Sequence, residues 1–193
     1  MNAENLKKRG GSIQAALNLE LADLNIDSLS IKIEGENGKL PNLDLFNTII
    51  KICKTLQFKC ALDSEKSPKD YTNYKFDRRE PNDYLVSVLN TLNMLFKQAT
   101  GVSFSSHSGF INYRIEAVTI GSINSVKLLD NKKNFRQSVI KATRIVEGTM
   151  RSINNLLERF HQSFFFYLLP SSNLYISIGM YMPSIGLICL PCE

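Results

Sequence analysis

The sequence predicts an α/β domain in which helices cover a layered sheet. Leu29 to Ile33 (LSIKI) alternates apolar and polar residues, which is the pattern of a strand. Leu43 to Leu56 follows with helical spacing, and a second helix and strand come after it, so strands and helices alternate along the chain. The 193 residues suffice for one domain with an appendage, and 44% hydrophobic with 21% charged residues is a globular composition.

The first third of the chain is expected to supply two strands, a helix and a loop. Ser12 to Leu21 is short and apolar, and Glu20 lies at its end. Gly35 to Asn42 (GENGKLPN) has the composition of a turn. In the helix that follows, apolar residues recur on one face. The segment 59–81 is charged, contains two prolines and has no period, so it is predicted to be a flexible loop.

The middle of the chain predicts a helix, a loop and a strand. Asp83 to Ala99 has helical spacing, with Asn82 or Asp83 placed to cap its start and Gly101 just past its end. Ser103 to Gly109 is a loop of small residues that carries His107. Ile115 to Ile120 (IEAVTI) is then predicted to be a strand.

A long amphipathic helix is expected over 131–169. Apolar residues from Phe135 to Phe164 recur at steps of three or four, and most arginines and lysines lie off this stripe. From Phe160 to Leu169 the pattern becomes apolar on every side, which indicates burial or contact with lipid. We therefore expect this helix to reach a membrane interface; the alternative for its first half is packing against its own domain.

The uncharged segment 174–190 is predicted to be a transmembrane segment. Seventeen helical residues span about 25 Å, slightly less than the roughly 30 Å hydrocarbon core. The alternative is a buried core helix. The residues just before this segment are then expected to lie at the membrane interface, namely His161, Phe164, Phe165, Phe166 and Tyr167.

Charge and cysteine content narrow the classes of function. The net charge is +5, without a compact block of basic and aromatic residues, so nucleic acid is not the expected partner. The spacing of Cys53 and Cys60 allows a disulfide, or else Cys53 is a buried helix residue; Cys189 and Cys192 form a terminal CxxC with no further zinc ligands nearby. The amino end has no apolar signal-peptide region.

Glu20 and His107 are the weak candidates for a metal site. Loops at strand ends of α/β domains often build sites, and both residues are expected at such ends. One histidine and one carboxylate do not complete a zinc site, which needs at least three protein ligands. The chain contains no HExxH, GxSxG, GxGxxG or P-loop pattern, and no residues specify a catalytic triad.

Five segments in order resemble the glycosylphosphatidylinositol (GPI) anchor attachment protein family. They are GSIQAALNLEL, IEGENGKLPNLDLFN, SSHSGFINYRIEAVTI, LLERFHQSFFFYLLP and SIGMYMPSIG. The resemblance runs from about Arg9 to Leu187. It implies a subunit of the GPI transamidase complex in the endoplasmic reticulum membrane, with a luminal domain similar to di-zinc aminopeptidases.

The resemblance also implies domain boundaries and a reduced metal site. Residues 1–125 would form a partial luminal aminopeptidase-like domain. Glu20 matches the metal-binding acid of an NLDM-type strand, and His107 matches the histidine of an SDHxxF loop, where Ser106 replaces the acid. The upstream ligands and the general-base glutamate have no counterpart here, so a zinc ion is expected only in a full-length family member. Asp44 is expected to complement the dipole of a helix start or to cap it.

The expected function is therefore a non-catalytic role in attaching GPI anchors to proprotein carboxyl termini. The subunit would position the proprotein and the GPI lipid beside a catalytic partner, which lowers the entropic cost of joining them. One alternative is a zinc-dependent aminopeptidase-like hydrolase, which would need the missing base. Another is an inactive truncated product of the same family.

Overall fold

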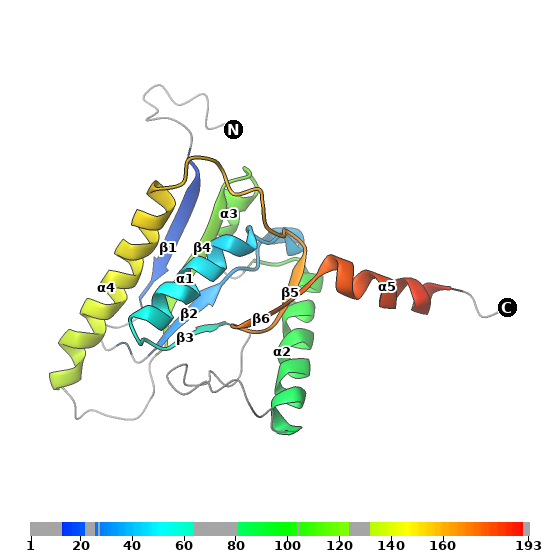
Figure 1. Cartoon of the computed structure of the whole chain (residues 1–193), viewed down its shortest axis with the longest axis horizontal. Helices are drawn as coiled ribbons and strands as arrows, with labels where there is room; N and C mark the ends of the chain where they lie inside the picture. Colours follow the sequence, from blue (N-terminus) through cyan, green and yellow to red (C-terminus); the bar gives the residue numbers. More distant parts are fainter. Residues whose placement is uncertain are drawn as a thin grey trace.

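The computed structural model describes residues 13–21, 26, 28–63, 81–103, 105–123 and 132–190. Its strands are β1 (Ala15–Glu20), β2 (Ser28–Lys32), β3 (Cys60–Leu62), β4 (Glu116–Ile123), β5 (Tyr167–Ser171) and β6 (Leu174–Ser177). Its helices are the 3-10 turn η2 (Glu36–Gly38), α1 (Leu43–Thr55), α2 (Pro81–Thr100), α3 (Ser108–Ile111), α4 (Lys132–Asn154) and α5 (Ile178–Cys189). The predicted α/β class is confirmed (Figure 1).

Four strands form one mixed sheet in the order β1–β4–β2–β3. Strand β1 runs parallel to β4, β2 runs antiparallel to β4, and β3 runs parallel to β2. A parallel pair needs a crossover connection, and α1 is the crossover between β2 and β3. Strands β5 and β6 form a separate antiparallel pair beside α2.

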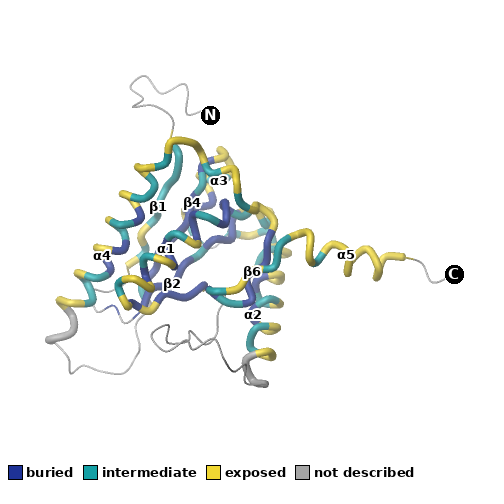
Figure 2. The backbone as a smooth tube through the Cα atoms, in the orientation of Figure 1, coloured by how far each residue is buried: buried dark blue, intermediate teal, exposed yellow. Residues whose placement is uncertain are grey.

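One face of the four-stranded sheet is apolar, and α1 and α4 cover it (Figure 1). Leu29, Ile31 and Ile33 supply this face from β2 and the residue after it, and Val118 and Ile120 supply it from β4. All five are at most 1% exposed. The dark core in Figure 2 follows these strands and the inner side of α1. Burial of this apolar surface is the main force that holds the helices on the sheet.

Helix α1 begins where the sequence supplies a cap. The side-chain oxygen of Asn42 accepts a hydrogen bond from the backbone N–H of Asp44 at 3.0 Å, so Asn42 is the capping residue. Asp44 lies in the first turn, where its negative charge is favourable beside the helix dipole. The helix predicted over 43–56 is thus confirmed.

The helix predicted over 83–99 is also confirmed, as α2. It begins earlier than expected, at Pro81, so Asn82 and Asp83 lie inside its first turn rather than before it. Gly101 follows the last helical residue with a φ of +65°, a backbone conformation that glycine adopts without strain. This left-handed residue ends the helix.

A disulfide joins Cys53 near the end of α1 to Cys60 at the start of β3. Both cysteines are at most 1% exposed, so the bond lies inside the core. Both alternatives for Cys53 are confirmed together, since it is a buried residue of α1 and is bonded to Cys60. The bond ties the crossover helix to the strand that it delivers.

The loop predicted over 59–81 differs from the structure at both of its ends. Cys60 to Leu62 form β3 and are buried, and Pro81 is the first residue of α2. The remainder of this prediction, 64–80, lies outside the described residues. A three-residue strand is too short to show a period of two, so β3 could not be recognised from its residue pattern.

The single helix predicted over 131–169 is wrong. Helix α4 ends at Asn154, and the chain then runs in irregular conformation from the end of α4 to β5 (Figure 1). Tyr167, Leu168 and Leu169 are buried in β5. A short run that is apolar on every side fits a buried strand as well as a buried helix, because it has no period that separates the two.

The predicted transmembrane segment 174–190 is not supported. Leu174 to Ser177 form β6, and the helix α5 that follows has 12 residues. In the part of the chain that the structure describes, we find no helix whose length and apolar character suffice to cross a bilayer. Figure 1 shows α5 extending away from the sheet, and Figure 2 shows it exposed over nearly its whole length.

Candidate functional site

Polar side chains from three strands gather on the sheet face opposite the apolar core. Asn18 and Glu20 come from β1, Thr119 from β4 and Lys32 from β2. Asn18 and Lys32 each lie directly opposite Thr119 in the strand register. Since alternate residues of a strand point to one face, these four side chains share a face with little apolar character.

The hydroxyl of Thr119 is the centre of a hydrogen-bond network on this face. It lies 3.0 Å from Nδ2 of Asn18, 2.7 Å from Oγ of Ser105 and 2.9 Å from Nδ1 of His107. The Ser105 hydroxyl also donates a hydrogen bond to Oε1 of Glu20. The loop that carries Ser105 and His107 is thereby fixed over the sheet.

The carboxylate of Glu20 is held by a lysine. Lys32 Nζ lies 2.8 Å from Oε2 of Glu20, and Asn18 donates to Oε1 at 3.0 Å. Hydrogen bonds from Lys32 and then Ser105 lower the pKa of Glu20, although its partial burial acts in the opposite direction. Glu20 is therefore ionised at neutral pH, and its charge is matched by Lys32.

His107 is buried at the edge of the same network, with 1% of its surface exposed. Burial lowers the pKa of its imidazole, because the charged form would lose hydration, so the ring is neutral at pH 7. Its Nε2 atom is buried and has no hydrogen-bond partner among the described residues. His107 and Glu20 thus belong to one network, joined through Ser105 and Thr119.

The described residues around Glu20 and His107 do not form a zinc site. Zinc needs at least three protein ligands in tetrahedral arrangement, and the described residues contain no cluster of three His, Cys, Asp or Glu side chains that could hold one. Oε2 of Glu20 already binds the ammonium group of Lys32. Ser105 donates a hydrogen bond to Glu20, and the Thr119 hydroxyl lies within hydrogen-bond distance of both Ser105 and His107. We call these contacts between the loop and the sheet the polar clasp.

Sequence reasoning found Glu20 and His107 but missed Asn18, Lys32 and Thr119. Each of the three occupies a polar position in an otherwise alternating strand, so the period of two carried a signal for this face. The order of the strands was needed to bring them together, and no local pattern encodes that order.

A second buried acid lies at the end of the β2 segment. Glu34 is 5% exposed; its Oε2 accepts the backbone N–H of Ile33 at 3.3 Å, and its Oε1 has no hydrogen-bond partner in the described part of the chain. Burial raises the pKa of Glu34, while the positive charge of Lys97 acts against the shift. The folded state therefore favours the protonated carboxyl group.

Replacement of Glu34 by glutamine is expected to raise the free energy of unfolding at pH 7.5 by on the order of 1 kcal/mol, because a neutral amide does not carry the cost of ionising a buried carboxyl group. The folded state binds this proton more tightly than the unfolded state, so the wild-type protein loses stability as pH rises from about 4.5 through the raised pKa. Urea unfolding between pH 4.5 and 8 measures the difference. Glu158→Gln, at an exposed acid, is the control; an equal effect of both variants contradicts the prediction.

The residues predicted at a membrane interface divide into two groups. Phe164, Phe165 and Phe166 are exposed, at 42%, 39% and 66%. Tyr167 is 1% exposed, and its hydroxyl donates a hydrogen bond to the carbonyl of Pro41 at 2.9 Å, so its placement at an exposed interface is wrong. His161 is exposed and lies 3.6 Å from a carboxylate oxygen of Glu158.

The exposed phenylalanines are continuous with further apolar surface. The rings of Phe164 and Tyr175 have centroids 5.9 Å apart, and Ile178 N–H donates to the carbonyl of Phe166. We call this surface, together with α5, the apolar edge. Its large exposed residues are Phe164, Phe165, Phe166, Leu174, Tyr175, Ile178, Met180, Met182, Ile185, Leu187, Ile188 and Leu190. Contiguous apolar surface of this kind marks an interaction site.

Comparison with known proteins identifies relatives along almost the entire chain. The family described as "Gaa1-like, GPI transamidase component" matches residues 1–192. The protein named GPI transamidase component gaa1 of Schizosaccharomyces pombe is 37% identical over 182 residues, which cover 93% of this chain and 29% of the relative. GPI transamidase component GAA1 of Saccharomyces cerevisiae is 35% identical over 178 residues, 91% of this chain and 26% of the relative. The chain thus spans less than a third of either relative.

Proposed function

Because the chain belongs to the Gaa1-like family of GPI transamidase components, we propose that it acts within the GPI transamidase complex. The complex attaches GPI anchors to the carboxyl termini of proproteins in the endoplasmic reticulum membrane. In this proposal the chain positions the proprotein and the GPI lipid and does not supply the nucleophile. The observation that carries the proposal is the family match over residues 1–192.

The polar clasp supports a positioning role. A catalytic serine needs a base that takes its proton, and the carboxylate of Glu20 that accepts from Ser105 is a weak base, because its hydrogen bond from Lys32 lowers its pKa. The hydroxyl of Thr119 is engaged by three side chains. A rigid scaffold that holds two substrates together accelerates their joining without chemistry of its own.

The disulfide supports a luminal location for the main domain. Disulfides persist in oxidising compartments such as the endoplasmic reticulum lumen and are rare in the cytosol. The Cys53–Cys60 bond lies in the core of the domain.

The apolar edge supports contact with the bilayer. Phenylalanine and tyrosine are well suited to the interfacial region, where Phe164 to Phe166 and Tyr175 would insert. His161 lies on the chain just before these rings, where a polar side chain would meet lipid headgroups. A zinc ion remains a proposal for the full-length family member only, since the described residues of this chain do not form its site.

The proposal predicts that the tagged chain is recovered from cell membranes with the other transamidase subunits after mild detergent extraction. Phe165→Asp is expected to lower its recovery in the membrane fraction about fivefold to tenfold, because a half-exposed ring that entered lipid would be replaced by a charge. Phe110→Asp is the matched control, since Phe110 is 40% exposed and lies in α3, outside the apolar edge. The readouts are immunoblots of membrane fractions and of the purified complex.

Two results would contradict these proposals separately. If the wild-type chain brings down no other transamidase subunit, its place in the complex is wrong. If it brings them down but Phe165→Asp and Phe110→Asp fractionate alike, the complex stands and the membrane contact of the apolar edge is wrong.

A further inference from the structure

A groove runs along the outer side of the helical layer, between α1 and the chain from α4 onward. One section has a volume of about 380 Å³ and lies between the carboxyl-terminal half of α1 and α4. The next, of about 600 Å³, lies between the amino-terminal half of α1 and residues 155–162. Because the wall that α1 and its capping residue form runs from Asp44 to Leu56, the groove is about 18 Å long. That length suits three turns of a helix or about five extended residues.

The floor of the first section is apolar, and the α4 residue that faces it is a glycine, which has no side chain to fill the space. Ile52 of α1 and Leu56, the residue after the helix, line it and are partly buried against the core. Gly148 of α4 faces them, and a Cβ atom at this glycine would lie 3.3 Å from Cγ2 of Ile52. The glycine lets the two helices approach closely and leaves the neighbouring space open to a side chain from outside.

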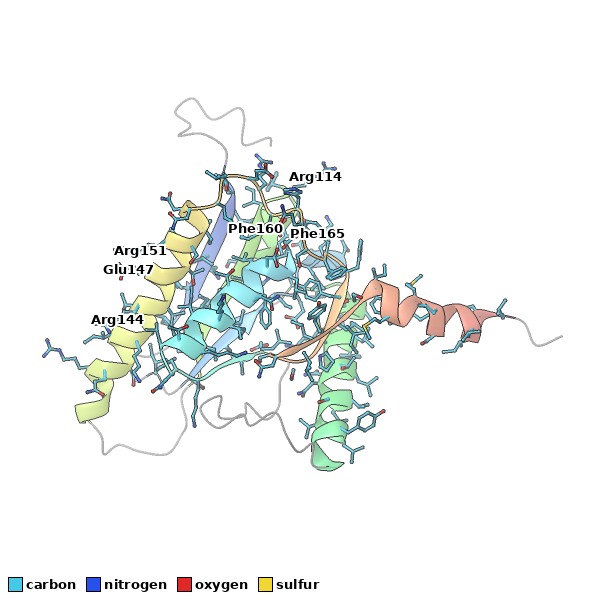
Figure 3. All side chains as sticks on the ribbon, in the orientation of Figure 1. Arg114, Arg144, Glu147, Arg151, Phe160 and Phe165 are labelled. Atoms are coloured by element: carbon cyan, nitrogen blue, oxygen red, sulfur yellow. A yellow bond between two sulfur atoms is a disulfide. The ribbon has the colours of Figure 1, made fainter. Side chains whose placement is uncertain are left out.

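The rim of this section is basic. Arg144 and Arg151 of α4 stand on it; Arg151 binds Glu147 at 2.8 Å and is 78% exposed. Arg144 has no ion-pair partner within the described part of the chain. The adjoining section is balanced in charge, because Lys51 and Arg159 line it together with Asp44 and Glu158, so the excess of positive charge lies in the first section. In Figure 3, Arg144, Glu147 and Arg151 follow one another along α4, well apart from Phe165.

The two helices concentrate the positive charge of the protein. Together α1 and α4 contain eight lysines and arginines and two acidic residues, whereas the net charge of the whole chain is +5. The remainder of the chain is therefore close to neutral. A basic rim around an apolar floor is complementary to a segment that presents carboxylates around a large apolar side chain.

The shape favours a peptide segment over a lipid surface. A bilayer is broad, so it contacts side chains that protrude from the protein, such as those of the apolar edge. Ile52 and Leu56 instead lie in the hollow between two helices. We propose that an acidic amphipathic segment of another transamidase subunit docks in the α1–α4 groove, with an apolar side chain on Ile52 and Leu56 and carboxylates on Arg144 and Arg151. This inference rests on the proposed place of the chain in the complex.

The test uses a charge reversal within the groove and one outside it. Arg144→Glu/Arg151→Glu is expected to lower recovery of at least one other transamidase subunit at least tenfold, because two attractive contacts become repulsive. Arg114→Glu, at an exposed arginine on the turn after α3, is the control and should change recovery less than twofold. Thermal unfolding of each purified variant confirms that the fold is retained.

A direct binding measurement accompanies the recovery. A fluorescein-labelled peptide of leucines and glutamates in amphipathic order is titrated with the purified chain at low and high salt. The wild type is expected to bind this peptide with an affinity that falls as the salt concentration rises. The groove variant is expected to bind it at least tenfold more weakly. A peptide in which lysines replace the glutamates should not bind to the wild type. Equal binding of the peptide by the wild type and the groove variant would overturn the inference.

The outcomes separate this inference from the proposed function. If the wild type recovers no other subunit, the proposed function fails. If the wild type and the groove variant recover them equally, the function stands and the groove inference fails. If the groove variant loses binding only to phosphatidylserine vesicles and keeps its subunits, the groove contacts lipid and the inference is likewise overturned.

Discussion

Replacing Tyr167 by alanine is expected to lower the free energy of unfolding by about 3 to 5 kcal/mol, the usual cost of removing a large aromatic side chain from a core. Tyr167 is 1% exposed and lies in the same core cluster as the residues of α1 and the sheet. Its hydroxyl donates to the carbonyl of Pro41, so the loop before α1 would also lose a buried partner. Urea unfolding followed by circular dichroism measures the change.

Tyr175→Ala is the matched control for this prediction. Tyr175 lies in the neighbouring strand β6 and is 49% exposed, so its removal is expected to cost less than about 1 kcal/mol. Tyr167→Phe should fall between the two, at about 1 kcal/mol, because it removes only the hydrogen bond. If Tyr167→Ala and Tyr175→Ala destabilise the protein equally, Tyr167 does not belong to the core.

Removing the disulfide has the second largest expected effect. Cys53→Ser/Cys60→Ser should lower the free energy of unfolding by about 2 to 3 kcal/mol, since the bond closes a short loop and restricts the unfolded chain. Reduction of the wild-type protein should give a similar loss. Mass spectrometry after alkylation, with and without reductant, measures whether the two thiols are bonded.

Cys189→Ser is the control, because Cys189 is exposed and is not bonded in the structure. It should leave the stability unchanged and remove one alkylation site. The prediction fails if Cys53 and Cys60 are alkylated without reductant, or if their replacement costs no more than that of Cys189.

Local patterns predicted the elements that local forces determine. The helices at α1 and α2 were recognised because their apolar residues repeat at helical spacing, and Gly101 ends α2 for a reason visible in the sequence. The chain after Asn154 was not recognised, because Phe164 to Leu169 have no period. Packing against the sheet and Pro41, distant in sequence, decides that Tyr167 is buried and Phe166 is not.

In the candidate site, too, local motifs predicted some residues, and the order of the strands decides the others. Glu20 and His107 could be named from their motifs, but their partners could not. Lys32 reaches Glu20 because β2 lies beside β4 and β4 beside β1, an order that no short segment specifies. That order makes Glu20 the partner of a lysine, a result that its similarity to a metal-binding acid did not predict.

The pairing of β1 with β4 also has a consequence for biosynthesis. Asn18 and its partner Thr119 are 101 residues apart, whereas β2, α1 and β3 are consecutive. At about 5 to 20 residues per second, a ribosome makes β1 roughly 5 to 20 s before β4 exists. During that time β2, α1 and β3 can associate while β1 has no neighbour and exposes its backbone. We therefore expect the nascent chain to depend on chaperones until β4 emerges, and the polar clasp to form among the last contacts.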